Sequence, residues 1–187
     1  MSLNKIQARL KTAASPAIAE QVKRIAPGST KVYGIKMPLL NELAKEMKEG
    51  GFDLVESLWE SGSYEEKMVA SKMLRLIAKK DPEKAMELVE NYSREIDNWT
   101  ICDTLGMQSL KSINKIRPKE IFALANKLSL SKNMWQRRLS LVLVEDFCKL
   151  PEFHDAVGKL IEKQKGDKEY YIKKAVIWLE SSMKKHI

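Results

Sequence analysis

Residues 63–92, SYEEKMVASKMLRLIAKKDPEKAMELVENY, contain the start signals of two consecutive helices. Ser63 is followed three residues later by Glu66, the spacing of a capping box, which marks the beginning of a helix. Asp81-Pro82 then begins a second helix, because the first helical turn tolerates proline, whose missing N–H would have no partner there. The stretch therefore predicts a helical hairpin.

The same pattern returns along the chain at nearly constant spacing. We expect first helices to begin near Ser63, Asp97, Ser131 and Asp167, at separations of 34, 34 and 36 residues. In the first three cases a proline begins the second helix 19 to 21 residues later, at Pro82, Pro118 and Pro151. Repeats of this length stack their hairpins and bury one continuous core, as in an α-solenoid.

The chain ahead of these repeats also has a helical pattern. Helices are expected near residues 3–13, 15–26, 37–49 and 52–61, and they form irregular hairpins within residues 1–62. Because no convincing alternating run of β-branched residues occurs, the predicted fold is all-α, with one solenoid domain over residues 1–187. The alternative is a generic helical bundle whose helix lengths match by chance.

Composition limits the function classes. The chain has 187 residues, 44% hydrophobic and 31% charged, which is enough for one globular domain with a core. It contains no apolar run long enough for a membrane span and no signal-peptide core. Two cysteines (Cys102 and Cys148) and two histidines, scattered in the sequence, form no metal-binding spacing. We therefore expect a cytoplasmic protein without a metal site.

The net charge of +8, from 33 basic and 25 acidic residues, favours a polyanionic partner, nucleic acid before membrane. In a solenoid, equivalent positions of successive repeats line up on one face. The sixth and seventh residues after each expected first-helix start are polar in three repeats: Asp103 and Thr104, Arg137 and Arg138, Lys173 and Lys174. In the first repeat, Val69 and Ala70 contribute no charge there.

These aligned polar positions form a predicted ridge across the first helices, and three tryptophans flank it at same-face helical spacing. Trp99 lies four residues before Asp103, Trp135 three before Arg138, and Trp178 four after Lys174. The pattern predicts a cationic groove with one carboxylate, in which the DNA-binding residues are Arg137, Lys173, Lys174 and Trp135. Cationic side chains would follow a phosphate backbone, and indole rings would stack on bases or sugars.

A lone aspartate repels phosphates, so it suits a ligand that carries positive charge at one point. A purine alkylated at a ring nitrogen is such a ligand, and cleavage of its glycosidic bond builds oxocarbenium character on the sugar. A nearby carboxylate stabilises that charge and positions water. The simpler alternative is that Trp135 and Trp178 are core residues, as we expect for Trp59, and that Asp103 pairs with Arg138 only to satisfy its charge.

The sequence resembles the DNA alkylation repair enzymes built from HEAT-like repeats, the alkylpurine DNA glycosylases. The matching segments are YGIKMPLLNELAKEM (33–47), LWESGSYEEKMVASKML (58–74), DNWTICD (97–103), KNMWQRRLSLV (132–142) and EYYIKKAVIWLE (169–180). The resemblance implies a right-handed superhelical solenoid of HEAT-like hairpins, with duplex DNA on its concave basic face. It also implies excision of cationic lesions such as 3-methyladenine and 7-methylguanine, without metal or cofactor.

Carried over by motif, the catalytic residues are Asp103, Trp99, Arg138 and Trp178. The resemblance implies that Asp103 stabilises the oxocarbenium ion and orients water, and that Trp99 and Trp178 hold the sugar and its cationic base. Arg138 would hold phosphate and position Asp103. We expect a monomer, associated with the nucleoid, that acts on double-stranded DNA containing alkylated purines. A non-catalytic DNA-binding solenoid and a protein-interaction scaffold are the alternatives.

Overall fold

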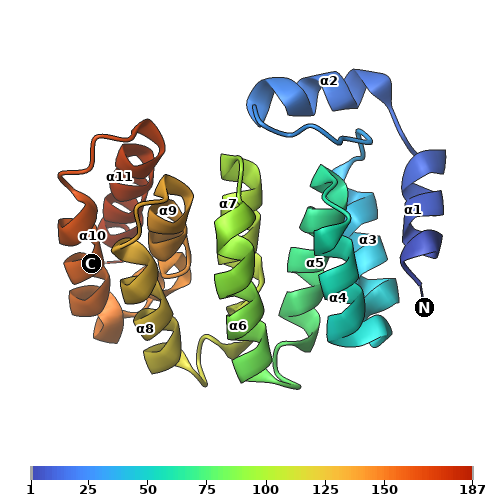
Figure 1. Cartoon of the computed structure of the whole chain (residues 1–187). Helices are drawn as coiled ribbons and strands as arrows, with labels where there is room; N and C mark the ends of the chain where they lie inside the picture. The colour runs from blue at the N-terminus through green and yellow to red at the C-terminus, as the bar shows by residue number, and fades with distance from the viewer. Residues whose placement is uncertain (1, 187) are drawn as a thin grey trace.

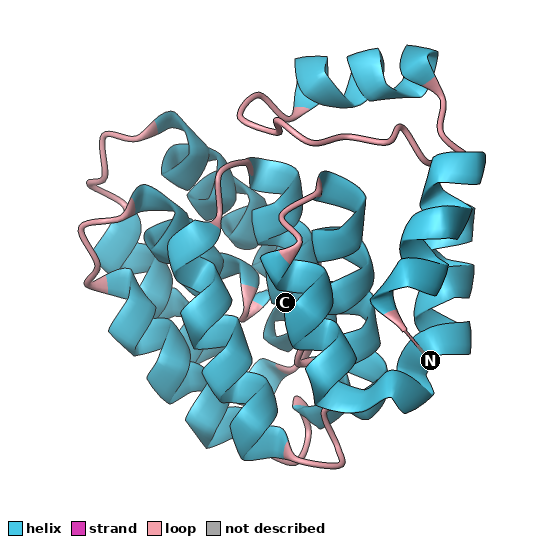
Figure 2. Cartoon of the chain, turned by 45° about the vertical axis from the view of Figure 1, so that its right-hand side comes forward, coloured by secondary structure: helices cyan, strands magenta, loops and turns pink. Residues whose placement is uncertain are grey.

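The computed structural model describes residues 2–186, and within this range every regular element is a helix (Figure 2). The α-helices are α1 (Leu3–Thr12), α2 (Pro16–Ile25), α3 (Met37–Met47), α4 (Gly51–Glu60), α5 (Tyr64–Ile77), α6 (Pro82–Tyr92), α7 (Trp99–Gln108), α8 (Pro118–Ser129), α9 (Met134–Val142), α10 (His154–Gln164) and α11 (Tyr170–Lys184). Short 3-10 turns lie between some of them: η1 (Lys48–Gly50), η2 (Ser93–Glu95), η3 (Lys111–Ile113), η4 (Glu145–Lys149) and η5 (Pro151–Phe153). The predicted all-α fold is confirmed. Of the helices in this range, none is both long and apolar enough to cross a membrane.

Proline and cap residues start most helices where the sequence predicts. α6 and α8 begin at Pro82 and Pro118, whereas Pro151 begins the turn η5 and α10 follows at His154. At the start of α5, the Ser63 hydroxyl accepts the backbone N–H of Glu66 at 3.2 Å, which is one half of a capping box. These starts depend on residues close in sequence, which is why the pattern predicts them.

The helices pack in two layers in chain order. α3, α5, α7, α9 and α11 contact one another in that order, and in the other layer α6 contacts α8 and α8 contacts α10. In Figure 1 the stack runs from α3 on the right to α10 and α11 on the left. This order agrees with stacked hairpins. The right-handed course stays a prediction, as does a single domain over 1–187, whose residues 1 and 187 lie outside the described range.

One hydrophobic cluster runs through the stack from Ile6 to Leu179. Trp59 lies in it with 1% of its surface exposed, and its ring stacks on Tyr92 with 4.2 Å between centroids. Its Nε1 donates to the Glu95 carboxylate at 3.1 Å, so the polar end of the indole has a partner. Trp59 is therefore a core residue, as predicted.

The N-terminal segment is irregular, because α2 lies crosswise to the stack (Figure 1). The chain between α2 and α3 is fixed to α5 by the buried carboxylate of Glu65. This carboxylate accepts the backbone N–H groups of Tyr33, Gly34 and Ile35 at 3.0, 2.7 and 3.2 Å. Gly34 has φ +80°, and a Cβ there would lie 2.1 Å from the carbonyl oxygen of Ser15, so only glycine fits. These contacts fix the segment between α2 and α3 to α5 and to the start of α2.

Candidate active site

Trp99 and Asp103 lie on one face of α7 and line the same cleft. The Asn98 side chain caps the helix by accepting the N–H of Ile101 at 3.0 Å, and it donates to Ser29 Oγ at 3.0 Å. The cleft has a volume of about 290 Å³ and lies between α2, α3, α5 and α7. Its lining includes Ile25, Met37, Tyr64, Met68, Lys72, Trp99, Thr100, Asp103, Thr104, Met107 and Gln108.

The carboxylate of Asp103 is held by a fork from the next helix of the layer. Arg138 of α9 donates from Nε and Nη2 to the two carboxylate oxygens, at 2.9 and 2.8 Å. Its Nη1 donates to the carbonyl of Tyr171 in α11. Arg138 therefore connects three helices of the layer, and the bidentate geometry fixes the plane of the carboxylate.

The pair is buried to different degrees. The Arg138 side chain is 7% exposed and the Asp103 side chain 19%. Burial raises the pKa of Asp103 above its ordinary value, although the hydrogen bonds and the charge of Arg138 act in the opposite direction. Because each oxygen uses one acceptor position on Arg138, the carboxylate keeps acceptor capacity toward the cleft. It is a positioned anion that still reaches solvent.

The indole of Trp99 is fixed by the N-terminal segment. Its Nε1 donates to the carbonyl of Ile25, at the end of α2, at 2.6 Å. Ile25, Met37 and Met107 line the same cleft and are 55%, 43% and 37% exposed. The cleft therefore combines the Asp103 carboxylate and the Lys72 ammonium with an apolar wall that includes the Trp99 indole. The indole and the carboxylate suit a flat, apolar or cationic group.

The observed helix starts change the register of the predicted ridge. Asp103, Arg138 and Lys174 are each the fifth residue of their helices α7, α9 and α11. Arg137 and Lys173 are therefore equivalent to Cys102, one position earlier. The sequence places the start of α9 at Ser131, but Asn133 is the cap and accepts the N–H of Trp135 at 2.8 Å. The repeat is thus in register for one residue of each predicted pair.

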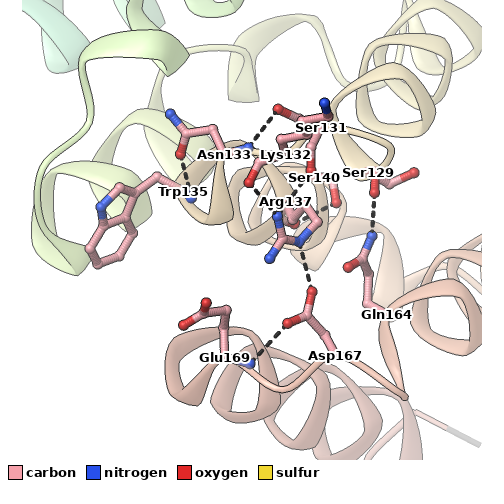
Figure 3. A network of polar contacts seen from close by, with 10 residues as sticks. All are labelled: Ser129, Ser131, Lys132, Asn133, Trp135, Arg137, Ser140, Gln164, Asp167 and Glu169. Atoms are coloured by element: carbon pink, nitrogen blue, oxygen red, sulfur yellow. Dashed lines mark hydrogen bonds and ion pairs between the residues drawn. The ribbon is translucent and has the colours of Figure 1, made fainter.

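Arg137 is part of a polar network that closes the loops before α9 and α11 (Figure 3). Its Nε donates to Asp167 at 2.7 Å, and its Nη1 donates to the carbonyls of Ser131 and Lys132 at 3.0 and 2.9 Å. Asp167 in turn accepts the N–H of Glu169 at 2.9 Å. These contacts give Arg137 a structural role, and its predicted DNA contact stays a prediction.

The remaining predicted residues come from α9 and α11. Trp135 is partly buried against the core, 5.0 Å from the ring of Tyr171, and Trp178 also packs partly buried against the core. Trp178 is not among the described residues that line the cleft of Asp103. Lys173 and Lys174 are exposed on α11, where Lys174 lies 5.6 Å from the centre of the Tyr170 ring. Their proposed DNA contacts stay predictions.

The two cysteines are free and buried. Burial, more than the neighbouring Asp103 charge, raises the pKa of Cys102 well above its usual value, and its thiol lies 3.7 Å from the carbonyl of Trp135. Burial raises the pKa of Cys148 to about 12. Both are therefore packed thiols with little thiolate at neutral pH. Within residues 2–186 no group of three or more His, Cys, Asp or Glu side chains is arranged to hold a metal ion.

Sequence reasoning did not identify several residues that line the cleft. Ile25 is one, because its approach to Trp99 depends on the path of the chain between α2 and α3. Lys72 is another, although its spacing of four residues from Met68 and three from Arg75 places all three on one helical face. That spacing was the available signal. The prediction instead used the ridge positions of this repeat, Val69 and Ala70, which are buried.

Comparison with known proteins gives one family. The sequence profile described as DNA alkylation repair enzyme matches residues 6–186, which is nearly the whole chain. A search of curated proteins found no match. The profile match includes the helices that carry Trp99, Asp103 and Arg138, and the all-helical stack agrees with the family resemblance in the sequence. The chain therefore belongs to the DNA alkylation repair enzyme family.

Proposed function

We propose that this protein is a DNA glycosylase that hydrolyses the N-glycosidic bond of cationic N-alkylated purines in duplex DNA. The observation that carries the proposal is the Asp103 carboxylate, oriented by two bonds from Arg138 and still 19% exposed beside the indole of Trp99. An anion fixed in this way does not need to reorganise when positive charge develops on the sugar.

The proposed mechanism assigns one task to each residue. The carboxylate of Asp103 faces C1′ of the damaged nucleotide, stabilises the oxocarbenium ion and accepts a hydrogen bond from the attacking water. Trp99 presents its ring to the cationic base or sugar, with its Nε1 anchored on Ile25. Arg138 keeps Asp103 ionised and oriented, and Trp178 would complete the site from α11. Because the base is already cationic, it leaves as a neutral purine without prior protonation.

The test measures base release from duplex DNA that carries one 7-methylguanine, and from a second duplex with 3-methyladenine. We expect wild-type protein to release the base, and Asp103→Asn to lower single-turnover excision by about 10²-fold or more. The matched control is Asp155→Asn, because that carboxylate is 82% exposed and pairs with Lys159 on the surface of α10. Undiminished excision by Asp103→Asn would contradict the proposed role.

A second candidate is a non-catalytic DNA-binding protein. It is favoured by the same ion pair, since Asp103 and Arg138 also satisfy each other as a structural contact between α7 and α9. Under this alternative the wild type binds duplex DNA in a salt-sensitive way and releases neither lesion. Asp103→Asn then changes stability only.

A further inference from the structure

A second hollow lies beside the cleft of Asp103 and is lined by cations. It has a volume of about 360 Å³, lies between α3, α5 and α7, and is lined in part by Lys45, Lys72, Arg75 and Gln108. Lys72 and Gln108 also line the cleft that contains Trp99 and Asp103. The two hollows are therefore adjacent and share these two side chains.

The three cations have no acidic partner among the residues that the structure describes, whereas many cations elsewhere do. Lys84 pairs with Glu56, Arg117 with Glu83, and Lys127 with Glu90. Acidic residues on α3 are also engaged elsewhere, because Glu42 and Glu46 both pair with Arg9 of α1. Three cations around one hollow, without acidic partners in the described range, leave a local excess of positive charge that an anion would neutralise.

The side chains of α5 in this hollow are partly ordered before any ligand arrives. Arg75 donates from Nη1 to Gln108 Oε1 at 3.0 Å, which leaves its other guanidinium donors and the Gln108 amide N–H groups available. Lys72 is half-buried, and burial together with the charge of Arg75 lowers its pKa. An ammonium without full hydration and without a counter-charge gains more from an anion than an exposed lysine does.

We propose that Lys45, Lys72, Arg75 and Gln108 form a phosphodiester-binding subsite that holds a DNA backbone phosphate beside the nucleotide in the Asp103 cleft. The tetrahedral oxygens of a phosphate match a guanidinium fork with an adjacent ammonium better than a single carboxylate would. The subsite lies on the α3 side of Asp103, and the predicted contacts Lys173 and Lys174 lie on the α11 side. The bound strand therefore crosses the layer with its target nucleotide between two groups of cations.

This inference rests on the DNA ligand of the proposed function but not on base release. The first measurement is fluorescence anisotropy with an unmodified labelled duplex at several salt concentrations. We expect the double variant Lys72→Met, Arg75→Gln to bind at least about tenfold more weakly. Its salt dependence should fall by about 0.9 in log–log slope for each phosphate that the variant no longer neutralises. Lys45→Gln, an exposed position, gives a smaller change in the same direction without risk to the core.

The matched control is the double variant Lys115→Met, Lys119→Met. It also removes two positive charges, but from exposed positions just after η3 and in α8. Neither lysine forms an ion pair with a described residue. We expect this control to bind nearly as the wild type does. If it weakens binding as much as the α5 double variant, net charge explains the effect and the subsite is refuted.

A second measurement locates the phosphate. Duplexes with a single neutral methylphosphonate at successive positions around 7-methylguanine are compared in the wild type and the α5 double variant. A methylphosphonate at one position next to the lesion should weaken DNA binding by the wild type and leave binding by the variant unchanged. Equal losses at every position in both proteins would overturn the proposal. If the wild type releases the base but the α5 double variant binds the duplex normally, the subsite alone is refuted. If one phosphate position matters selectively but no base is released, the glycosylase proposal alone is refuted.

Discussion

Replacing Arg138 by glutamine tests whether its guanidinium stabilises the ionised form of Asp103. Two charge-assisted hydrogen bonds disappear, each contributing about 1.5–3 kcal/mol, and the Asp103 charge is left without its partner. Breaking a buried pair in this way costs about 3–5 kcal/mol. Because Asp103 keeps 19% of its side chain exposed, we expect the lower end, about 3 kcal/mol, in the free energy of unfolding near neutral pH.

The same change should raise the pKa of Asp103 further, because only Arg138 acts to lower it against burial. A carboxyl whose pKa is higher in the folded state stabilises the fold at low pH, and this contribution is lost as pH rises through the folded pKa. The loss of unfolding free energy relative to the wild type should therefore be larger at pH 7.5 than at pH 5.

Urea unfolding at the two pH values measures the stability, and the ¹³C shift of the Asp103 carboxyl measures its titration. Arg117→Gln is the control, since its guanidinium is 40% exposed and pairs with the surface residues Glu83 and Glu120. An exposed pair of this kind contributes less than about 1 kcal/mol. Equal losses in the two variants, with an unchanged titration of Asp103, would refute the reasoning.

The pH dependence of excision, two glycine positions and Trp59 give further predictions. Excision by the wild type should fall as pH decreases through the raised pKa of Asp103, because the protonated acid no longer stabilises an oxocarbenium ion; an enzyme-free sample corrects for spontaneous depurination, and a flat acid limb would contradict the role. Gly34→Ala should cost more than about 2 kcal/mol, since its Cβ meets the Ser15 carbonyl at φ +80°. Gly158→Ala, in α10 with no atom within 4 Å of the added Cβ, should stabilise the fold by about 0.5–1 kcal/mol. Thermal unfolding of the two glycine variants measures both effects. Trp59→Ala should cost about 3–5 kcal/mol in urea unfolding, and a loss below about 1 kcal/mol would contradict its place in the core.

The helices and their order were predictable because their signals are local. Pro82 and Pro118 begin α6 and α8, and Ser63 caps α5, since caps and first turns involve residues within one helical turn. The shared face of Trp99 and Asp103 follows from the same helical period. The expected starts lie two to three residues before the first residues of α7, α9 and α11. At α7 and α9 several neighbouring polar residues were possible caps, and only the folded chain shows that Asn98 and Asn133 accept the N–H.

The tertiary structure alone decided which side chains meet across helices. The sequence offered the pair of Arg138 and Asp103 only as an alternative and through the family resemblance. Spacing alone could not decide that Arg138 turns to Asp103 while Arg137 turns to Asp167, because a shift of one residue rotates a side chain by about 100° around the helix. Nor could it place Ile25 beside Trp99, since that hydrogen bond joins residues 74 positions apart in the sequence. Sequence thus determined the helices and the chemical character of the site. Packing determined its partners, because long-range contacts depend on the rotation and approach of whole helices.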